Sequence, residues 1–242
     1  YGKALAFAAC KPLIGVHHLE GHILASFLEH PHLNFPFLAL VVSGSHSGLI
    51  IAEDFGKYKQ LGQSRDDAAG EAFDKIARSL GLPYPGGPAI QAVAQTGEPI
   101  YDFPKALLKE SYDFSFSGLK SAVLNFLNRA KMKGEAYKAA DVAASAQEAI
   151  VDILAYKAAM AADKLNLDTI VLAGGVAANE ALRQKVHAYA PQKQLVYPSI
   201  GFCTDNAAMI GAAALPKYHK KEFASLTLNA IANFPITKLF SE

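Results

Sequence analysis

The chain has 242 residues, of which 51% are hydrophobic and 19% charged, and this composition excludes a disordered tail or a coiled coil. Its 23 Lys and Arg residues against 22 Asp and Glu residues give a formal net charge of +1, which excludes binding of polyanions through bulk charge and leaves only local basic faces. The two cysteines, Cys10 and Cys203, match no CxxC pattern, so a disulfide framework is excluded and a reducing, cytoplasmic compartment is favoured.

The sequence predicts no membrane segment and no signal peptide. The longest apolar runs, 37–42 and 209–215, are too short to span a bilayer, and no charged region precedes an apolar one near the start. Tyr1 already lies in a helix-like sequence that does not begin with Met, from which we expect the chain to be the middle of a longer protein.

Predicted strands and helices alternate along the chain, which indicates an α/β fold. Apolar residues recur three or four positions apart in the expected helices, and unbroken apolar runs mark the expected strands. Gly81 is expected at the end of one helix, and Ser117 and the pair Thr204-Asp205 are expected to cap two others. The expected helices are 2–9, 17–29, 66–80, 90–95, 119–129, 141–165, 179–190 and 206–215, and the expected strands are 13–16, 37–42, 49–52, 169–173 and 195–197.

His18 and His22 are the first candidates for chemistry. Four residues apart on a helix, they share one face at about 5–6 Å, a spacing that lets two imidazoles bind one metal ion. The order does not fit a zinc peptidase, because Leu19 follows His18 and Gly21 precedes His22 where those motifs need a glutamate. Gly21 costs a helix about 1 kcal/mol relative to Ala, which favours close approach of another group to this face. A pair of surface histidines explains the spacing equally well.

Two turns of small residues follow predicted strands. The turn 43–48 offers backbone N–H groups to a phosphate, although an ordinary hairpin turn explains it at least as well. Gly174-Gly175 leads into a helix N-terminus, which favours an anion, and Asn179 adds a side-chain donor and acceptor. Neither a GxGxxG nor a GxxxxGK[ST] pattern is present, so this turn is either a different nucleotide site or a tight strand–helix connection.

Two aspartates and two basic clusters complete the candidates. Asp205, at a predicted helix start, is either an N-cap or a carboxylate metal ligand. Asp74 precedes the loop 83–88 with its Gly86-Gly87 pair, where it is either solvated or ribose-binding. The basic residues between 120 and 138, and those of 217–221, are the places where a nucleic-acid phosphate backbone could dock, and solvated faces are the alternative.

Six collinear segments together resemble one family: GVHHLEGH, LVVSGSHSGL, DDAAGEAFDKIARSLGLPYPGGPAI, DFSFSGLKSAV, VLAGGVAANEALR and CTDNAAMIGAAA. The family is TsaD (also YgjD, or OSGEP in eukaryotes), the tRNA threonylcarbamoyladenosine transferases. The resemblance implies an actin-like, ribonuclease H-like two-lobed α/β fold of the ASKHA class, with the first lobe incomplete. It implies a first-lobe remnant over 1–35 that carries the His helix, a second, nucleotide-binding lobe over 36–215, and a tail over 216–242 that packs back on the first lobe.

The resemblance also implies an activity. The threonylcarbamoyl group of threonylcarbamoyl-AMP would be transferred to N6 of adenosine 37 in tRNAs that read codons starting with A. One iron or zinc ion would be held by His18, His22 and Asp205, and ATP or ADP could occupy the adenylate pocket. No catalytic base can be named. The implied substrate-binding residues are Val41, Val42, Ser43, Gly44 and Ser45 for the phosphate and acyl part, Asp74 and Gly87 for the ribose and adenine, and Asn179 for the nucleotide.

Two departures from the family leave alternatives open. Ser45 stands where the family usually has glycine, and we expect crowding there, with strain if its φ is positive. The family's first phosphate loop is absent, so a non-catalytic nucleotide- and metal-binding fragment or scaffold subunit is the alternative function. A metallopeptidase and a sugar kinase of the same fold are disfavoured. The implied partners are tRNA, TsaB-like and TsaE-like proteins in a bacterium, and a second copy in a dimer.

Overall fold

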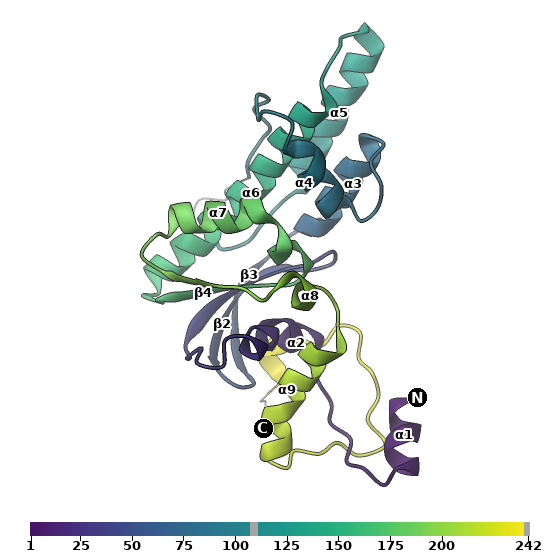
Figure 1. Cartoon of the computed structure of the whole chain (residues 1–242), viewed down its shortest axis with the longest axis vertical. Helices are drawn as coiled ribbons and strands as arrows, with labels where there is room; N and C mark the ends of the chain where they lie inside the picture. Colours follow the sequence, from purple (N-terminus) through teal and green to yellow (C-terminus); the bar gives the residue numbers. More distant parts are fainter. Residues whose placement is uncertain (107–110, 240–242) are drawn as a thin grey trace.

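A five-stranded sheet forms the centre of the protein in the computed structural model, which describes residues 1–106 and 111–239 (Figure 1). Its order is β3-β2-β1-β4-β5. The first three strands form an antiparallel meander, and β1, β4 and β5 are parallel. The strands are β1 Phe37–Val42, β2 Ser47–Asp54, β3 Lys57–Gln63, β4 Thr169–Ala173 and β5 Gln194–Val196.

The two central strands coincide with the two predicted apolar runs, 37–42 and 169–173. Every residue of β1 is buried, because helices cover both faces of the sheet. Leu38 and Leu40 face one core and pair in register with Ile170 and Leu172. The residues that alternate with them enter the second core on the opposite face.

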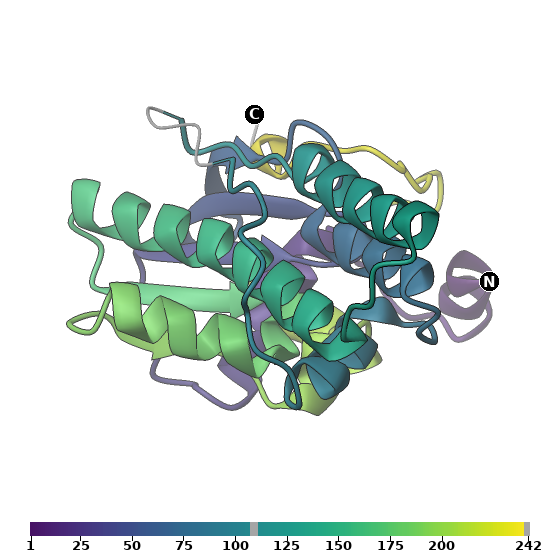
Figure 2. The same cartoon turned by 90° about the horizontal axis from the view of Figure 1, so that it is seen from above.

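The larger helical layer lies above the sheet in Figure 1 and is seen from above in Figure 2. The smaller layer, on the other face, contains the His-bearing helix α2 and the late helix α9. Helix α1, Gly2–Ala8, buries none of its residues and stands away from both layers. The larger layer consists of α3 Ala69–Ser79, α4 Gly86–Ala94, α5 Ser117–Lys133, α6 Ala139–Lys164 and α7 Glu180–Tyr189. The smaller layer consists of α2 His18–Leu24, η1 Ala25–Leu28, α9 Ala207–His219 and η3 Ile236–Lys238. The short connections η2 Gly175–Ala178 and α8 Ile200–Cys203 bury Ala177 and Cys203 in the core of the larger layer.

Several predicted elements are wrong. Residues 13–16 form no strand, and only Leu13 makes an isolated bridge, to Ala224. The edge strand β3 was not predicted, because its sequence KYKQLGQ is mostly polar and only two of its residues are buried. The predicted helix 17–29 changes to a 3₁₀ helix after Leu24. Gly86 and Gly87 lie in the first turn of α4 and not in a loop.

The capping residue of α5 also differs from the expectation. Ser117 is the first helical residue, and its hydroxyl donates a hydrogen bond to Asp66 Oδ2 at 2.7 Å. The other carboxylate oxygen of Asp66 accepts from the backbone N–H groups of Phe116 and Ser117. Asp66 therefore satisfies the start of α5 from a distant part of the chain, and it does not belong to α3.

The C-terminal tail runs back along residues 13–17. Ala224 N donates to Leu13 O at 2.8 Å, Lys217 Nζ donates to Gly15 O at 3.0 Å, and His17 Nε2 lies 2.7 Å from Phe234 O. The division into parts 1–35, 36–215 and 216–242 stays a prediction. No helix in the described part of the chain is both long enough and apolar enough to cross a membrane.

Candidate metal centre and adjoining loops

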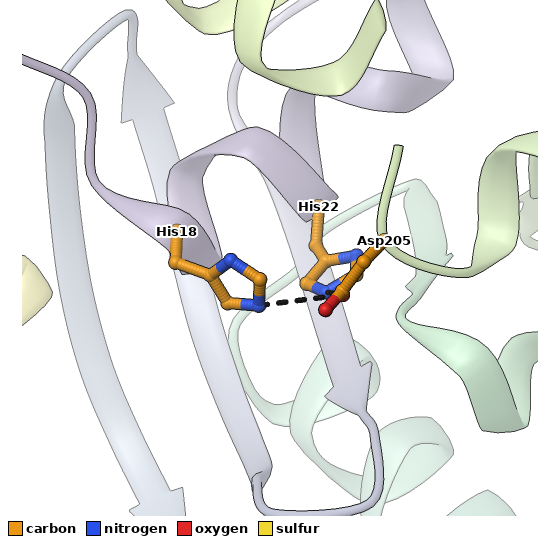
Figure 3. Close-up of side chains that lie close together, drawn as sticks. All are labelled: His18, His22 and Asp205. Carbon is orange, nitrogen blue, oxygen red and sulfur yellow. Dashed lines mark ion pairs between the residues drawn. The ribbon is translucent and has the colours of Figure 1, made fainter. Parts of the chain in front are cut away.

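The side chains of His18, His22 and Asp205 converge between α2 and the segment that leads into α9 (Figure 3). One ligand atom from each lies within 4.8 Å of the others. Asp205 Oδ1 is 3.1 Å from His22 Nε2 and 3.5 Å from His18 Nε2. The His22 side chain is only 1% exposed, whereas those of His18 and Asp205 are 49% and 77% exposed. His22 therefore forms the buried side of the group, and His18 and Asp205 form its solvent-exposed side.

Gly21 explains how α2 and α9 come close enough to form this group. A Cβ atom at Gly21 would lie 3.3 Å from Ile210 Cδ1 and 3.4 Å from Met209 Cγ, both on α9. The expected close approach to this face is therefore made by another helix, and a Cβ at position 21 would require the Ile210 and Met209 side chains on α9 to move by a few tenths of an ångström. Because Asp205 lies just before α9, this packing sets its distance from the histidines.

The cap of α9 is Asn206, not Asp205. Asn206 Oδ1 accepts from Met209 N at 2.9 Å, and its Nδ2 donates to Thr204 O at 2.8 Å. An amide side chain thus satisfies the helix start, and the neighbouring carboxylate is left to face the histidines. Of the two roles predicted for Asp205, the structure excludes the capping role.

The electrostatics of His22 fit a metal ligand. Burial, and then the neighbouring His18, lower the pKa of His22 against the opposing effect of Asp205, so that the neutral imidazole is favoured. Neither buried ring nitrogen of His22 has a hydrogen-bond partner among the described residues. A neutral nitrogen 3.1 Å from a carboxylate oxygen calls for a proton or a cation between them. Two imidazoles and one carboxylate are ligands that Zn²⁺ and Fe²⁺ accept.

His46 is a further residue near this group that the sequence motifs did not single out. Burial lowers its pKa first, and His18 and His17 lower it further, which places His46 on the same side of the molecule as α2. Its Nδ1 lies 3.0 Å from Ser45 Oγ in the turn after β1. The signal that could have found it is its position inside the polar turn 43–48.

The turn after β1 is closed by Ser43. Ser43 N donates to His46 O at 2.7 Å, and Ser43 Oγ accepts from His46 N at 3.1 Å. Val41 and Val42 are buried in the strand, while Gly44 and Ser45 are exposed. A Cβ at Gly44 would meet nothing within 4 Å, and φ at Ser45 is not positive. The strain considered for Ser45 is therefore absent, and an open surface lies over the turn.

Two glycines, Gly70 and Gly174, bring neighbouring backbones together at the carboxyl ends of β1 and β4. A Cβ at Gly70, in α3, would lie 2.5 Å from Ser43 O, and one at Gly174 would lie 2.4 Å from Val42 O. At Gly175 the nearest side-chain atom, Thr204 Cγ2, is 3.8 Å away, so this turn adjoins the segment that carries Asp205. Ligands of open α/β sheets bind at this kind of edge.

The other predicted substrate residues have structural contacts. Asp74 Oδ1 accepts from Gly86 N at 2.7 Å and so holds the start of α4, where Gly87 has open space around its Cα. Asn179 is 7% exposed and caps α7 through Leu182 N at 3.0 Å, and its Nδ2 donates to Gln147 Oε1. Both polar groups of Asn179 are therefore engaged in positioning the turn that follows β4.

Comparisons with known proteins give consistent matches. The family model for TsaD, tRNA N6-adenosine threonylcarbamoyltransferase, matches residues 1–212. The tRNA N6-adenosine threonylcarbamoyltransferase of Desulfitobacterium hafniense (strain Y51) is 57% identical over 234 residues, which are 95% of this chain and 68% of that protein. The protein of the same name from Moorella thermoacetica is 52% identical over 240 residues, 98% of this chain and 70% of that protein.

Solved structures of another protein share the fold. The crystal structure of HypF from T. kodakarensis superposes with a TM-score of 0.66 at 16% identity, over 89% of this chain and 38% of that one. Full-length HypF in a phosphate- and nucleotide-bound form gives a TM-score of 0.68 at 13% identity, over 89% and 37% of the two chains. At such identities the likeness shows the fold alone, an ASKHA-type α/β fold as expected.

Proposed function

The chain belongs to the TsaD family of tRNA N6-adenosine threonylcarbamoyltransferases, and on that premise we propose that His18, His22 and Asp205 hold one transition-metal ion at its reactive centre. The enzyme is an acyltransferase that forms N6-threonylcarbamoyladenosine in tRNA. The observation that carries the metal proposal is the buried His22 ring, whose two nitrogens lack hydrogen-bond partners in the described chain while a carboxylate lies 3.1 Å away.

The ligand set fits zinc or iron(II), with His22 as the buried anchor and His18 and Asp205 on the open side. An ion bound there supplies Lewis acidity toward a carbamoyl or phosphate oxygen. The chain's own contribution is to keep His22 neutral through burial and to hold Asp205 in place through the Asn206 cap. Three protein ligands leave room for a substrate oxygen.

We further propose that threonylcarbamoyl-AMP binds across the carboxyl ends of β1 and β4, in a pocket that also accepts ATP or ADP. The segment Val41–Ser45 faces the phosphate and acyl part, with open space over Gly44. Asp74 on α3 and Gly87 in the first turn of α4, which Asp74 holds through Gly86 N, face the ribose and adenine. Asn179 holds the turn against which the nucleotide lies. In the reaction the N6 amine attacks the carbamoyl carbon, the bond from that carbon to the phosphate oxygen breaks, AMP leaves, and N6 loses a proton.

The tRNA must be held by local basic faces, since the net charge is only +1. Lys217 is engaged with Gly15 O and with Glu20, which favours the cluster at the exposed end of α5, where Arg129, Lys131 and Lys133 lie. We propose that this end contacts the phosphate backbone while adenosine 37 of tRNAs that read codons starting with A reaches the metal. We also propose that TsaB-like and TsaE-like proteins bind this chain as partners and that two copies of the chain form a dimer.

Metal binding tests the centre directly. After removal of bound metal, the chain should bind one Co²⁺ or Zn²⁺ per molecule, and His18→Ala, His22→Ala and Asp205→Ala should each lower the affinity or abolish binding. His187→Ala is the matched control, because His187 is exposed on α7 in the other helical layer, away from the centre. Unchanged stoichiometry and affinity in His22→Ala would contradict this ligand set.

A further inference from the structure

A buried carboxylate lies on the reverse side of the helix that carries the two histidines. Glu20 is 1% exposed and stands two residues from both His18 and His22, so it projects from the opposite face of α2. This position also excludes the role of a water-activating glutamate beside the metal. Glu20 Oε1 accepts a hydrogen bond from Tyr58 on β3 at 3.2 Å. Its Oε2 lies 3.5 Å from Lys217 Nζ and has no hydrogen-bond partner among the described residues.

The contacts of Glu20 join three elements. Tyr58 is 6% exposed and belongs to the sheet, and Lys217 lies in the last part of α9. Lys217 also donates to Gly15 O at 3.0 Å, just before α2 begins. Asp205 lies just before the start of α9, so the same two helices that Glu20 links also position the three candidate ligands.

Burying a carboxylate and an ammonium costs more than burying apolar side chains of the same size. An apolar residue at Glu20 would pack against the core of this layer, which contains Ile23 and Val41, without that cost. Apolar packing has no direction, whereas the Tyr58 and Lys217 contacts fix the rotation of α2 about its axis. That rotation decides whether the imidazoles meet the carboxylate of Asp205.

We propose that Glu20 is a positioning residue of the metal centre, which holds α2 against β3 and α9 so that the ring nitrogens of His18 and His22 face Asp205. This inference rests on the proposed metal centre. Groups that hydrogen-bond a metal ligand directly typically change metal affinity by about 10- to 100-fold when removed, and Glu20, which acts through the orientation of α2, should act at the lower end of that range.

The test compares Co²⁺ titrations and Co²⁺ absorption spectra of variants in the full chain. Tyr58→Phe removes the hydrogen bond to Glu20, and Glu20→Gln and Lys217→Met remove the ion pair. Tyr189→Phe is the matched control, because Tyr189 makes the same kind of hydroxyl-to-carboxylate hydrogen bond, to Asp152 at 2.6 Å, in the other helical layer. Urea unfolding of every variant reports the general loss of stability.

We expect Tyr58→Phe and Glu20→Gln to bind Co²⁺ about tenfold more weakly, with a changed ligand-field spectrum, while Tyr189→Phe loses stability only. Equal Co²⁺ affinity in Tyr58→Phe, Tyr189→Phe and the unsubstituted chain would overturn the inference and leave the metal centre standing. An equal loss in both tyrosine variants would overturn it as well, since general destabilisation would then explain the effect. Failure of the unsubstituted chain to bind Co²⁺ or Zn²⁺ would overturn the metal centre itself, and this inference with it.

Discussion

Replacing Gly174 with alanine should damage the turn after β4 severely. Gly174 has φ 88° and ψ 169°, a backbone conformation that is essentially restricted to glycine. Forcing an alanine into such a region costs about 1–3 kcal/mol. The glycine was noted in the sequence for its position before a helix, and the structure adds the conformational reason for it.

A steric term adds to this backbone cost. The new Cβ would lie 2.4 Å from Val42 O and 2.8 Å from Val42 C, and both are main-chain atoms at the end of a central strand. They can shift only by disturbing the β1–β4 pairing, whose last pair is Val41 with Ala173. We expect a total loss of about 3–5 kcal/mol in the free energy of unfolding, a large part of the 5–15 kcal/mol typical of a domain.

Urea unfolding of Gly174→Ala and Gly175→Ala measures this directly. Gly175 is the matched control, because its φ is not in the left-handed region and a Cβ there would find only Thr204 Cγ2 at 3.8 Å. Gly175→Ala should change the free energy of unfolding by less than about 1 kcal/mol in either direction. The reasoning is refuted if Gly174→Ala loses less than about 1 kcal/mol, or if the two variants lose the same amount.

Three further predictions follow from contacts already described. Burial raises the pKa of Asp66, but hydrogen bonds from residues 115–117 outweigh it and hold the pKa below its usual value. Because the folded-state pKa is depressed, the stabilisation is present above about pH 4 and is lost as the pH falls below that. Asp66→Asn should therefore lower the free energy of unfolding by about 1 kcal/mol at pH 7 through the lost hydrogen bonds. The difference between the two chains should shrink as the pH falls through the depressed folded-state pKa of Asp66, and a constant difference across the acid range would contradict the assignment. Asn206→Ala should lower the free energy of unfolding in urea by about 1 kcal/mol, because it removes the N-cap of α9. It should also weaken Co²⁺ binding, because the cap leaves the adjacent Asp205 carboxylate available to the histidines, and an unchanged Co²⁺ affinity would contradict this link between the cap and the centre. The double variant Lys131→Glu, Lys133→Glu should weaken tRNA binding and flatten its dependence on salt, and an unchanged slope of log K against log salt would exclude this end of α5 as a contact.

Local patterns in the sequence predicted the elements that burial dominates. The runs 37–42 and 169–173 are β1 and β4 to the residue, because a strand buried on both faces needs an unbroken apolar sequence. Gly81 ends α3 with φ 71°, as a glycine after a helix commonly does. The His18–His22 spacing placed both imidazoles on one face for the same reason of helical periodicity.

Only the tertiary structure decided which distant residues meet these elements. Asp205 could have capped α9 by its sequence position. Because Asn206 is the cap instead, the Asp205 carboxylate faces the histidines. Asp66 supports the start of α5 across about fifty residues, and Glu20 finds Tyr58 and Lys217 on other elements. Periodicity and propensity are properties of neighbours along the chain, whereas these contacts depend on how the helices pack on the sheet. The sequence by itself therefore determined the buried strands β1 and β4 and the histidine face of α2, and the packing of α2 against α9 decided what that face could bind.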